Sequence, residues 1–244
     1  DSGVNFFDNA EGYNYGQSEK LMGKILKKMK WKRDTFTVSS KVFFGGNGKL
    51  PNQTGLSRKH VFEACHDALK RIQVDYLDMY FCHRPDPNTP IEETAWAMHQ
   101  LIMQGKVLYW GTSEWSGVEI MEAHRIAEKY RLIGPTMEQP QYNLLCRRRM
   151  EIEYRRVLQD LGIGTTIWSP LASGALTGKY VGGKIPPGSR LSLPEYSWLR
   201  DRVMNPEGQA KVEHLHAIAT KLNTSLSQFS IAWCLKNPQV STVN

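Results

Sequence analysis

The chain has 244 residues, of which 41% are hydrophobic and 23% charged, so it can bury one sizeable core and we expect a single domain over residues 1–244. Its net charge of +7 comes from scattered lysines and arginines without a patch interleaved with aromatic residues, and nucleic-acid binding is therefore not expected. No stretch approaches the roughly 18 apolar residues of a membrane span, so no direct membrane insertion is expected. The four cysteines form no CxxC pair, which predicts no metal site and suits a reduced, cytoplasmic compartment.

Strand-like runs alternate with helical patterns along the chain. In chain order the strand-like runs cover residues 4–7, 35–39, 76–82, 107–111, 136–138, 164–168 and 240–243. Apolar residues at helical spacing predict helices over 59–72, 90–104, 117–130, 150–161 and 210–222, and the lysines of residues 24–33 fit a solvated helix face. The alternation predicts a parallel sheet covered by helices, either doubly wound or closed into an eightfold barrel.

The glycine pattern favours the barrel. A doubly wound dinucleotide fold should have GxGxxG directly after its first strand, and neither of the two Gly-Gly pairs, at residues 45–46 and 182–183, has that context. In a barrel the chemistry collects at the carboxyl ends of the strands. Polar residues stand at the ends of the first three predicted strands: Asp8, Lys41 and His83. Tyr13 follows Asp8 in the first loop.

Each of these four residues alone has an ordinary structural explanation, such as a turn cap, a solvated charge or core packing. Their joint occurrence at three neighbouring strands favours a common site. Reduction of a carbonyl group needs such a set, because a phenol must donate a proton and is a weak acid at neutral pH. A nearby ammonium group stabilises the phenolate, a carboxylate holds the ammonium, and a histidine can orient the carbonyl oxygen.

Seven segments carry a family resemblance: NFFDNAEGYNYGQSEKLMG, GLSRKHV, LDMYFCHRPDPNTPIEET, GKVLYWGTSEWS, EQPQYN, WSPLASGALTGKY and IAWCLKNPQVSTV. Together they resemble the aldo-keto reductase superfamily, in particular the branch that contains the voltage-gated potassium channel β subunits, and they follow the family's order along nearly the whole chain. The resemblance implies an α/β fold of the (β/α)8 TIM barrel type, here lacking its first strand and its C-terminal segment. It also implies an NADP-dependent oxidoreductase.

The resemblance assigns a role to each matching position. The catalytic tetrad falls on Asp8, Tyr13, Lys41 and His83. The nicotinamide end of NADPH is expected at Ser113, Gln139 and Trp168. The residues expected to wrap the pyrophosphate are Ser169, Pro170, Leu171, Ala172, Ser173, Gly174, Lys179 and Arg190, although a loop of this composition is also compatible with an ordinary turn. Animal channel subunits of this family tend to have asparagine where this chain has His83, and the histidine favours an enzyme.

Three functions remain open at this stage. The first is an NADPH-dependent reductase acting on a small aldehyde or ketone, with Tyr13 as the general acid. The second is a cytosolic β regulatory subunit of a voltage-gated potassium channel with slow or vestigial reductase activity, which could bind a channel α subunit and form a homotetramer. The third is a non-catalytic barrel that serves as an interaction scaffold. His214 and His216 lie two apart on a predicted helix and point to different faces, so they make poor joint metal ligands.

Overall fold

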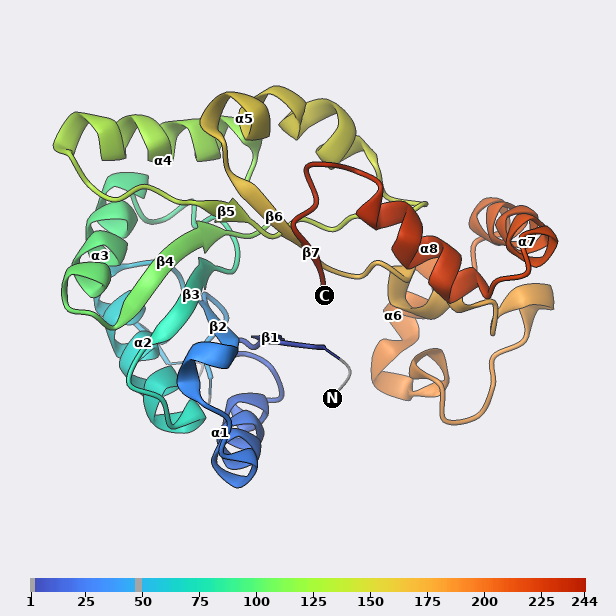
Figure 1. The fold of residues 1–244 in the computed structure, drawn as a ribbon, viewed down its shortest axis with the longest axis horizontal. Helices are drawn as coiled ribbons and strands as arrows, with labels where there is room; N and C mark the ends of the chain where they lie inside the picture. Colours follow the sequence, from blue (N-terminus) through green and yellow to red (C-terminus); the bar gives the residue numbers. More distant parts are fainter. Residues whose placement is uncertain (1–2, 47–49) are drawn as a thin grey trace. The chain divides into compact units, whose positions relative to one another are not determined.

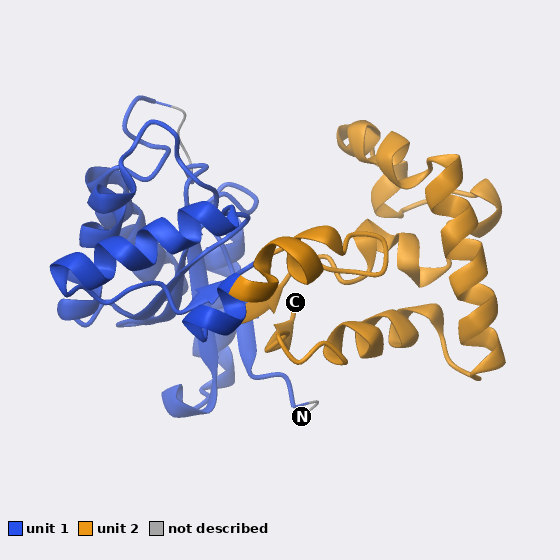
Figure 2. Ribbon diagram, turned by 90° about the horizontal axis from the view of Figure 1, so that it is seen from above, with its two compact units in different colours: residues 1–139, 157–163 blue, residues 140–156, 164–244 orange. Residues whose placement is uncertain are grey.

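The computed structural model describes residues 3–46 and 50–244, and these residues form two compact units. Unit 1 comprises residues 1–139 and 157–163, and unit 2 comprises residues 140–156 and 164–244 (Figure 2). A π-helical turn at Arg149–Glu153 runs into helix α5 (Tyr154–Leu161), which carries the boundary between the units at residue 156. The single domain expected over residues 1–244 stays a prediction.

Unit 1 is built around five parallel strands whose order in the sheet is also their order in the chain. The strands are β1 (Phe6–Asp8), β2 (Thr37–Val42), β3 (Leu77–Cys82), β4 (Val107–Thr112) and β5 (Met137–Glu138). A doubly wound sheet would reverse its strand order at a switch point, and this sheet does not within the described residues. The α/β class with a parallel sheet wound in one direction, which a barrel requires, is therefore confirmed.

Four helices of unit 1 lie side by side on one face of these strands (Figure 1). They are α1 (Gln17–Met29), α2 (Arg58–Ile72), α3 (Ile91–Met103) and α4 (Gly117–Tyr130). Two of them begin at serine caps: Ser57 accepts a hydrogen bond from His60 N, and Ser116 forms a reciprocal capping box with Glu119. Helix α1 exposes its lysines to solvent, as the sequence predicted.

A glycine allows helix α1 to approach helix α2 closely. A Cβ atom on Gly23 would lie 2.6 Å from the carbonyl oxygen of Arg71 and 2.7 Å from that of Ile72. Both oxygens belong to the last turn of α2, so no side-chain rotation could relieve the overlap. The two helices can therefore lie this close together only because residue 23 has no Cβ atom.

Unit 2 contains two short parallel strands, three α-helices and several 3-10 turns. The strands are β6 (Gly164–Ile167) and β7 (Thr242–Val243), and the helices are α6 (Ser197–Val203), α7 (Pro206–Lys221) and α8 (Leu226–Leu235). The 3-10 turns are η3 (Ala172–Thr177), η4 (Val181–Gly183), η5 (Arg190–Ser192) and η6 (Pro194–Tyr196). One core cluster joins η3 to helices α7 and α8 through Leu176, Val212 and Leu226.

Two sequence-based expectations about elements were wrong in detail. The strand expected at residues 35–39 is displaced, since Arg33–Thr35 forms a 3-10 turn (η1) and β2 runs from Thr37 to Val42. Lys41 therefore lies inside a strand and pairs with Phe81 in the register of β2 and β3. Helices α6 and α8 were not predicted. The sequence of α8, LSQFSIAWCL, places apolar residues on several faces and so lacks the amphipathic period on which the prediction relied.

Candidate active site

Lys41 is the centre of the candidate site in unit 1. Its side chain is fully buried, and its Nζ donates hydrogen bonds to Asp8 Oδ2 at 2.5 Å, to the carbonyl oxygen of Asn9 at 2.9 Å and to Tyr13 Oη at 3.1 Å. Because an ammonium group has three protons, these three acceptors use all of them. Lys41 is thus held in one position between a carboxylate and a phenol.

The alternation of β2 brings a second donor to the same carboxylate. Ser39 and Lys41 lie two residues apart and therefore face the same side of the sheet, while Ser40 faces the helices. Ser39 pairs with Asp8 in the register of β1 and β2, and its Oγ donates to Asp8 Oδ1 at 2.5 Å. Ser40 Oγ instead donates to Glu19 on helix α1. Asp8 is therefore fixed by one hydrogen bond to each of its two oxygens from β2.

Tyr13 lies in the turn between β1 and helix α1. The turn first follows β2, because Asn9 N donates to Ser39 O and Glu11 N donates to Lys41 O. After Tyr13 the chain adopts left-handed backbone angles at three successive residues, with φ of 45° at Asn14, 54° at Tyr15 and 78° at Gly16. The Tyr13 side chain remains 39% exposed, so its hydroxyl group combines contact with Lys41 and access from outside.

His83 directly follows β3 and lies beside Tyr13. The two rings meet edge to face with centroids 5.7 Å apart, and the ring of Phe44 meets the imidazole in the same manner at 5.0 Å. Burial, with smaller contributions from the cations of Lys41 and Arg84, lowers the pKa of His83 to about 2. The imidazole is therefore neutral at pH 7, and it can donate one hydrogen bond without carrying a charge.

Ser113 and Gln139 complete the part of the site in unit 1. They follow β4 and β5 directly, and Ser113 Oγ donates to Gln139 O at 2.9 Å. Gln139 Nε2 lies 3.5 Å from Asp8 Oδ1, which connects this pair to the carboxylate beside Lys41. All six predicted residues of unit 1 are thus brought together at the carboxyl ends of the strands.

The other predicted residues lie in unit 2, in the loop after β6. Trp168 follows Ile167, and the loop then takes left-handed angles at Ser169, Ala172, Ser173 and Gly174. Ser173 N donates to Ser169 Oγ at 3.1 Å, which closes the loop on itself. Pro170 and Leu171 lie between them and are partly exposed.

The sequence predicted that Lys179 and Arg190 would accompany this loop. In the structure the two side chains have different neighbours. A Cβ atom on Gly174 would lie 3.0 Å from Lys179 Cε and 3.1 Å from its Nζ, so the lysine amine rests against the loop backbone. Arg190 has another neighbour, since its guanidinium carbon lies 4.7 Å from the ring centroid of Tyr196. A loop with successive left-handed residues and an adjacent ammonium group fits an anionic ligand such as a diphosphate.

Sequence reasoning missed three residues that contact the tetrad, Ser39, Asn9 and Phe44, and a fourth, Glu11, that holds the backbone on both sides of Phe44. Ser39 could have been found from the alternation of β2, once the strand was known to include Lys41. Glu11 and Phe44 gave no signal, because their contacts depend on a close approach between two loops, in which Glu11 and Phe43 are 32 residues apart in the chain.

The thiol groups of three cysteines are buried and unreactive. Cys82 ends β3 next to His83, and burial raises its pKa well above the ordinary value for a thiol. Burial likewise raises the pKa of Cys65 to about 12 and that of Cys234 to about 11. All four cysteines, including the partly exposed Cys146, are free of disulfide bonds.

Across residues 3–46 and 50–244, no group of three or more His, Cys, Asp or Glu side chains is placed to hold a metal ion. No helix within the same ranges has the length and apolar character needed to cross a membrane.

Strands wound in one direction, with Asp8, Lys41, Tyr13 and His83 gathered at their carboxyl ends, define an α/β protein of barrel type with a cluster of titratable side chains at one edge of its sheet. The model of the aldo/keto reductase family matches residues 1–243. The chain therefore belongs to the aldo/keto reductase family, as the resemblance of its motifs implied.

Three relatives are similar over essentially the whole chain. A probable voltage-gated potassium channel subunit beta from Oryza sativa subsp. japonica is 49% identical over 243 residues, which are 100% of this chain and 74% of the relative. A protein of the same description from Arabidopsis thaliana has the same identity and the same coverage. A putative voltage-gated potassium channel subunit beta from Schizosaccharomyces pombe is 49% identical over 245 residues, 99% of this chain and 71% of the relative.

Proposed function

We propose that this protein is a reductase of aldehydes or ketones that uses NADPH, with Tyr13 as the proton donor. The observation that carries the proposal is the position of Lys41 Nζ, which is fully buried and in hydrogen-bond contact with both Asp8 and the Tyr13 hydroxyl group. NADPH, when bound, supplies the hydride. Membership of the aldo/keto reductase family supports the same class of oxidoreductase.

Tyr13 delivers a proton to the carbonyl oxygen as negative charge develops there. The phenolate that remains is stabilised by the ammonium group of Lys41 at 3.1 Å. Asp8 neutralises Lys41 and keeps it in place, with its second oxygen held by Ser39. A cation buried without this partner would be costly, so the acid and its stabilising charge depend on the carboxylate.

His83 orients the substrate carbonyl. A neutral imidazole has one N–H group, and within the described residues Nδ1 is buried with no hydrogen-bond partner. Since a buried unpaired N–H group is less tolerable than a buried unpaired lone pair, we assign the proton to Nε2. That N–H group donates to the carbonyl oxygen and stabilises the charge that develops on it.

The remaining predicted residues are proposed to hold NADPH. Ser113 and Gln139 offer a hydroxyl and an amide group for the carboxamide of the nicotinamide, and Trp168 offers an aromatic face for its ring. The diphosphate is proposed to bind the loop after β6, through Ser169, Pro170, Leu171, Ser173 and Gly174, together with Lys179 and Arg190. Left-handed backbone at Ser169, Ser173 and Gly174 and the amine of Lys179 beside Gly174 support this assignment.

The substitution Tyr13→Phe tests the reductase. It removes the acid but leaves the ring, so turnover of a reactive aldehyde should fall by about 10²–10⁴-fold. The affinity for NADPH, measured by the change in its fluorescence, should stay unchanged because the phenol acts in the transition state. Wild-type turnover in the Tyr13→Phe variant would refute the assignment, and absence of NADPH binding by the wild-type protein would refute the cofactor.

A second function is favoured by the comparisons. We propose that the protein also acts as a cytoplasmic β regulatory subunit of a voltage-gated potassium channel. Three relatives at 49% identity are described as probable or putative voltage-gated potassium channel beta subunits, which supports this function more directly than it supports catalysis. Contact with the membrane would then pass through a channel α subunit, and a homotetramer would match a fourfold channel. The two functions are compatible, because a slow reductase can serve as a regulatory module.

Binding to a channel tests the second function. The cytosolic N-terminal domain of a channel α subunit from the same organism should co-purify with this protein, and the Tyr13→Phe variant should co-purify equally well. Sedimentation should give a mass four times that of the chain. A monomeric protein that fails to retain the channel domain would refute the regulatory function and leave the reductase unaffected.

A further inference from the structure

A buried carboxylate that the proposed chemistry does not use lies behind the site. The Glu11 side chain is 3% exposed, and its Oε1 accepts three hydrogen bonds: from Phe43 N at 2.7 Å, from Gly45 N at 3.0 Å and from His60 Nε2 at 3.1 Å. A charged oxygen with three donors makes stronger hydrogen bonds than a neutral acceptor would. Glu11 therefore ties the turn that carries Tyr13 to helix α2 and to the loop that follows β2.

The loop held by Glu11 carries Phe44 to His83. In the chain, Phe44 stands between Phe43 and Gly45, whose backbone N–H groups both donate hydrogen bonds to Glu11. The centroid of the Phe44 ring is 5.0 Å from that of the His83 ring. The chain also approaches closely here, since a Cβ atom on Gly12 would lie 3.2 Å from Phe44 Cβ. The imidazole thus has an aromatic ring on two sides, Tyr13 at 5.7 Å and Phe44 at 5.0 Å.

Phe44 depends on the loop for its position because the core does not hold it. Its side chain is 50% exposed, so burial alone contributes only part of what a core phenylalanine would gain. A half-exposed ring on a loop has alternative positions, and each fixed hydrogen bond of the backbone removes some of them. Two of the three hydrogen bonds of Glu11, those from Phe43 N and Gly45 N, hold the backbone on both sides of this ring, and Gly55 N holds the carbonyl oxygen of Phe43 as well.

We propose that Glu11 is a positioning residue: by holding the backbone of Phe43 and Gly45, it keeps Phe44 against His83 and so fixes the imidazole beside Tyr13. The inference rests on the proposed reductase, since its effect on turnover passes through His83. Glu11 itself touches none of the four tetrad side chains by a hydrogen bond that the structure describes. Its effect on the chemistry is therefore indirect, unlike that of Asp8.

The position of the imidazole can be measured without turnover. The chain has seven histidines, and carbon and proton signals of labelled imidazoles respond to the ring currents of neighbouring aromatic residues. The His83 signal, assigned with His83→Gln, should move in Glu11→Ala and by a smaller amount in Glu11→Gln, which keeps an oxygen acceptor. The His60 signal should also move, because His60 loses its partner, and this movement confirms that the substitution acted at the intended place.

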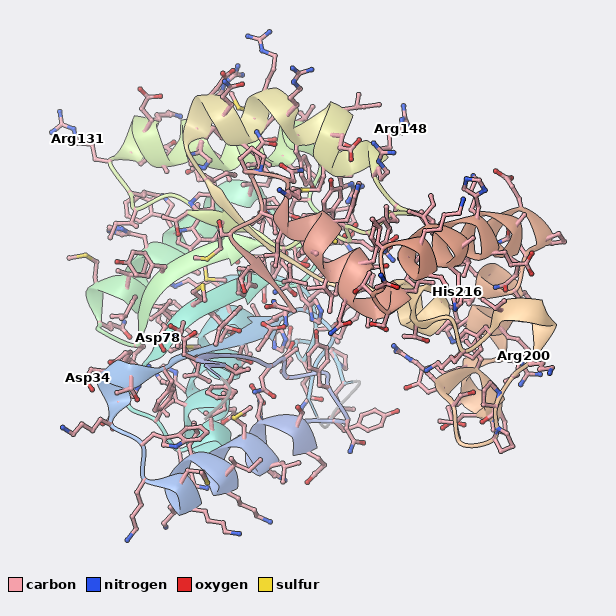
Figure 3. All side chains as sticks on the ribbon, turned by 45° about the vertical axis from the view of Figure 1, so that its right-hand side comes forward. Asp34, Asp78, Arg131, Arg148, Arg200 and His216 are labelled. Carbon is pink, nitrogen blue, oxygen red and sulfur yellow. The ribbon has the colours of Figure 1, made fainter. Side chains whose placement is uncertain are left out.

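Asp78→Ala is the matched control. Asp78 also accepts a backbone N–H group, that of Val38 at 2.8 Å, and a cationic side chain, that of Arg33. It is the second residue of β3 and is labelled in Figure 3. His83 follows the other end of that strand, so Asp78 and His83 lie at opposite ends of β3. The His83 signal should not move in Asp78→Ala. If the His83 signal moved equally in Asp78→Ala and in Glu11→Ala, the inference would be overturned.

Kinetics with aldehyde and NADPH test whether the effect passes through His83. Glu11→Gln should lower kcat about tenfold, within the range expected for coupled neighbours, and should leave the affinity for NADPH unchanged. In a His83→Gln background the same substitution should change kcat less than about twofold. A residue with only a general structural role would cost the same factor in both backgrounds, and that result would overturn the inference.

Phe44→Leu supplies a test that does not touch the buried carboxylate. It should reproduce the loss of kcat expected for Glu11→Gln, and the double variant Phe44→Leu with Glu11→Gln should have a kcat only slightly lower than that of Phe44→Leu alone. Unchanged kcat in Phe44→Leu would refute the inference even if Glu11→Ala failed to fold. Failure of the wild-type protein to reduce any aldehyde would refute the proposed function instead, while the His83 signals would still decide whether Glu11 positions the imidazole.

Discussion

The buried pair of Asp8 and Lys41 yields a sharp prediction about stability. Asp8→Asn keeps the shape of the side chain and an oxygen acceptor but removes its charge, so the fully buried Lys41 loses its carboxylate partner and keeps only neutral acceptors, among them the carbonyl oxygen of Asn9 and the hydroxyl group of Tyr13. Removing one partner of a buried ion pair costs 3–5 kcal/mol, and the 16% exposure of the Asp8 side chain places this case at the low end, about 3 kcal/mol.

The assay is equilibrium unfolding in urea at pH 7, followed by tryptophan fluorescence. Asp8→Asn should lower the midpoint with an unchanged slope. Adding Lys41→Met should recover about 2 kcal/mol, because the double variant no longer buries an unpaired cation. The reasoning would be refuted if the double variant were less stable than Asp8→Asn, or if Asp8→Asn cost less than about 1 kcal/mol.

Two further predictions concern His83 and Gly23. His83 has a folded-state pKa of about 2, below its ordinary value of 6.5, so its contribution to stability is complete above pH 6.5 and is lost as the pH falls toward 2. Between pH 6 and pH 4.5 the wild type should therefore lose about 2 kcal/mol more unfolding free energy than His83→Gln, and equal losses in urea titrations would contradict this. Gly23→Ala should destabilise by about 1–3 kcal/mol despite the better helix propensity of alanine, because its methyl group would overlap the carbonyl oxygens of Arg71 and Ile72. Lys24→Ala, on the exposed side of the same helix, should stay within about 0.5 kcal/mol of wild type when both variants are measured by unfolding in urea, and equal effects of the two substitutions would contradict the packing argument.

The sequence predicted that Asp8, Tyr13, Lys41 and His83 lie together because strand ends are marked by local signals, while their catalytic roles stay a prediction. A run such as LDMYFC is strongly apolar, and the polar residue that follows it, His83, has no packing reason to be there. The same reliance on a polar residue as the mark of a strand end misplaced the end of β2, which continues through Lys41 to Val42. Lysine is rarely fully buried without a partner, so its position inside a strand was not expected. Lys41 is buried because Asp8, on a neighbouring strand, pairs with it. A pairing between strands lies beyond what a local pattern can reveal.

The contacts of Glu11 could not have been predicted for a related reason. In the sequence it is one carboxylate in a polar turn, and nothing near it indicates that two backbone N–H groups from residues 43 and 45 will meet it. The glycine between Glu11 and Tyr13 is what allows the two loops to approach. Contacts of this kind depend on the three-dimensional path of both loops, which the periodicity of apolar residues does not describe.

The burial of Cys82 has a consequence for the proposed reductase activity. Reactive aldehydes are electrophiles, and a thiolate near the site would be alkylated by the very compounds that the protein is proposed to reduce. Cys82 precedes His83 in the chain, yet its thiol group is buried and its pKa is raised, so it stays protonated and is a poor nucleophile. The burial of Cys82 therefore removes one route by which a proposed aldehyde substrate could modify the protein.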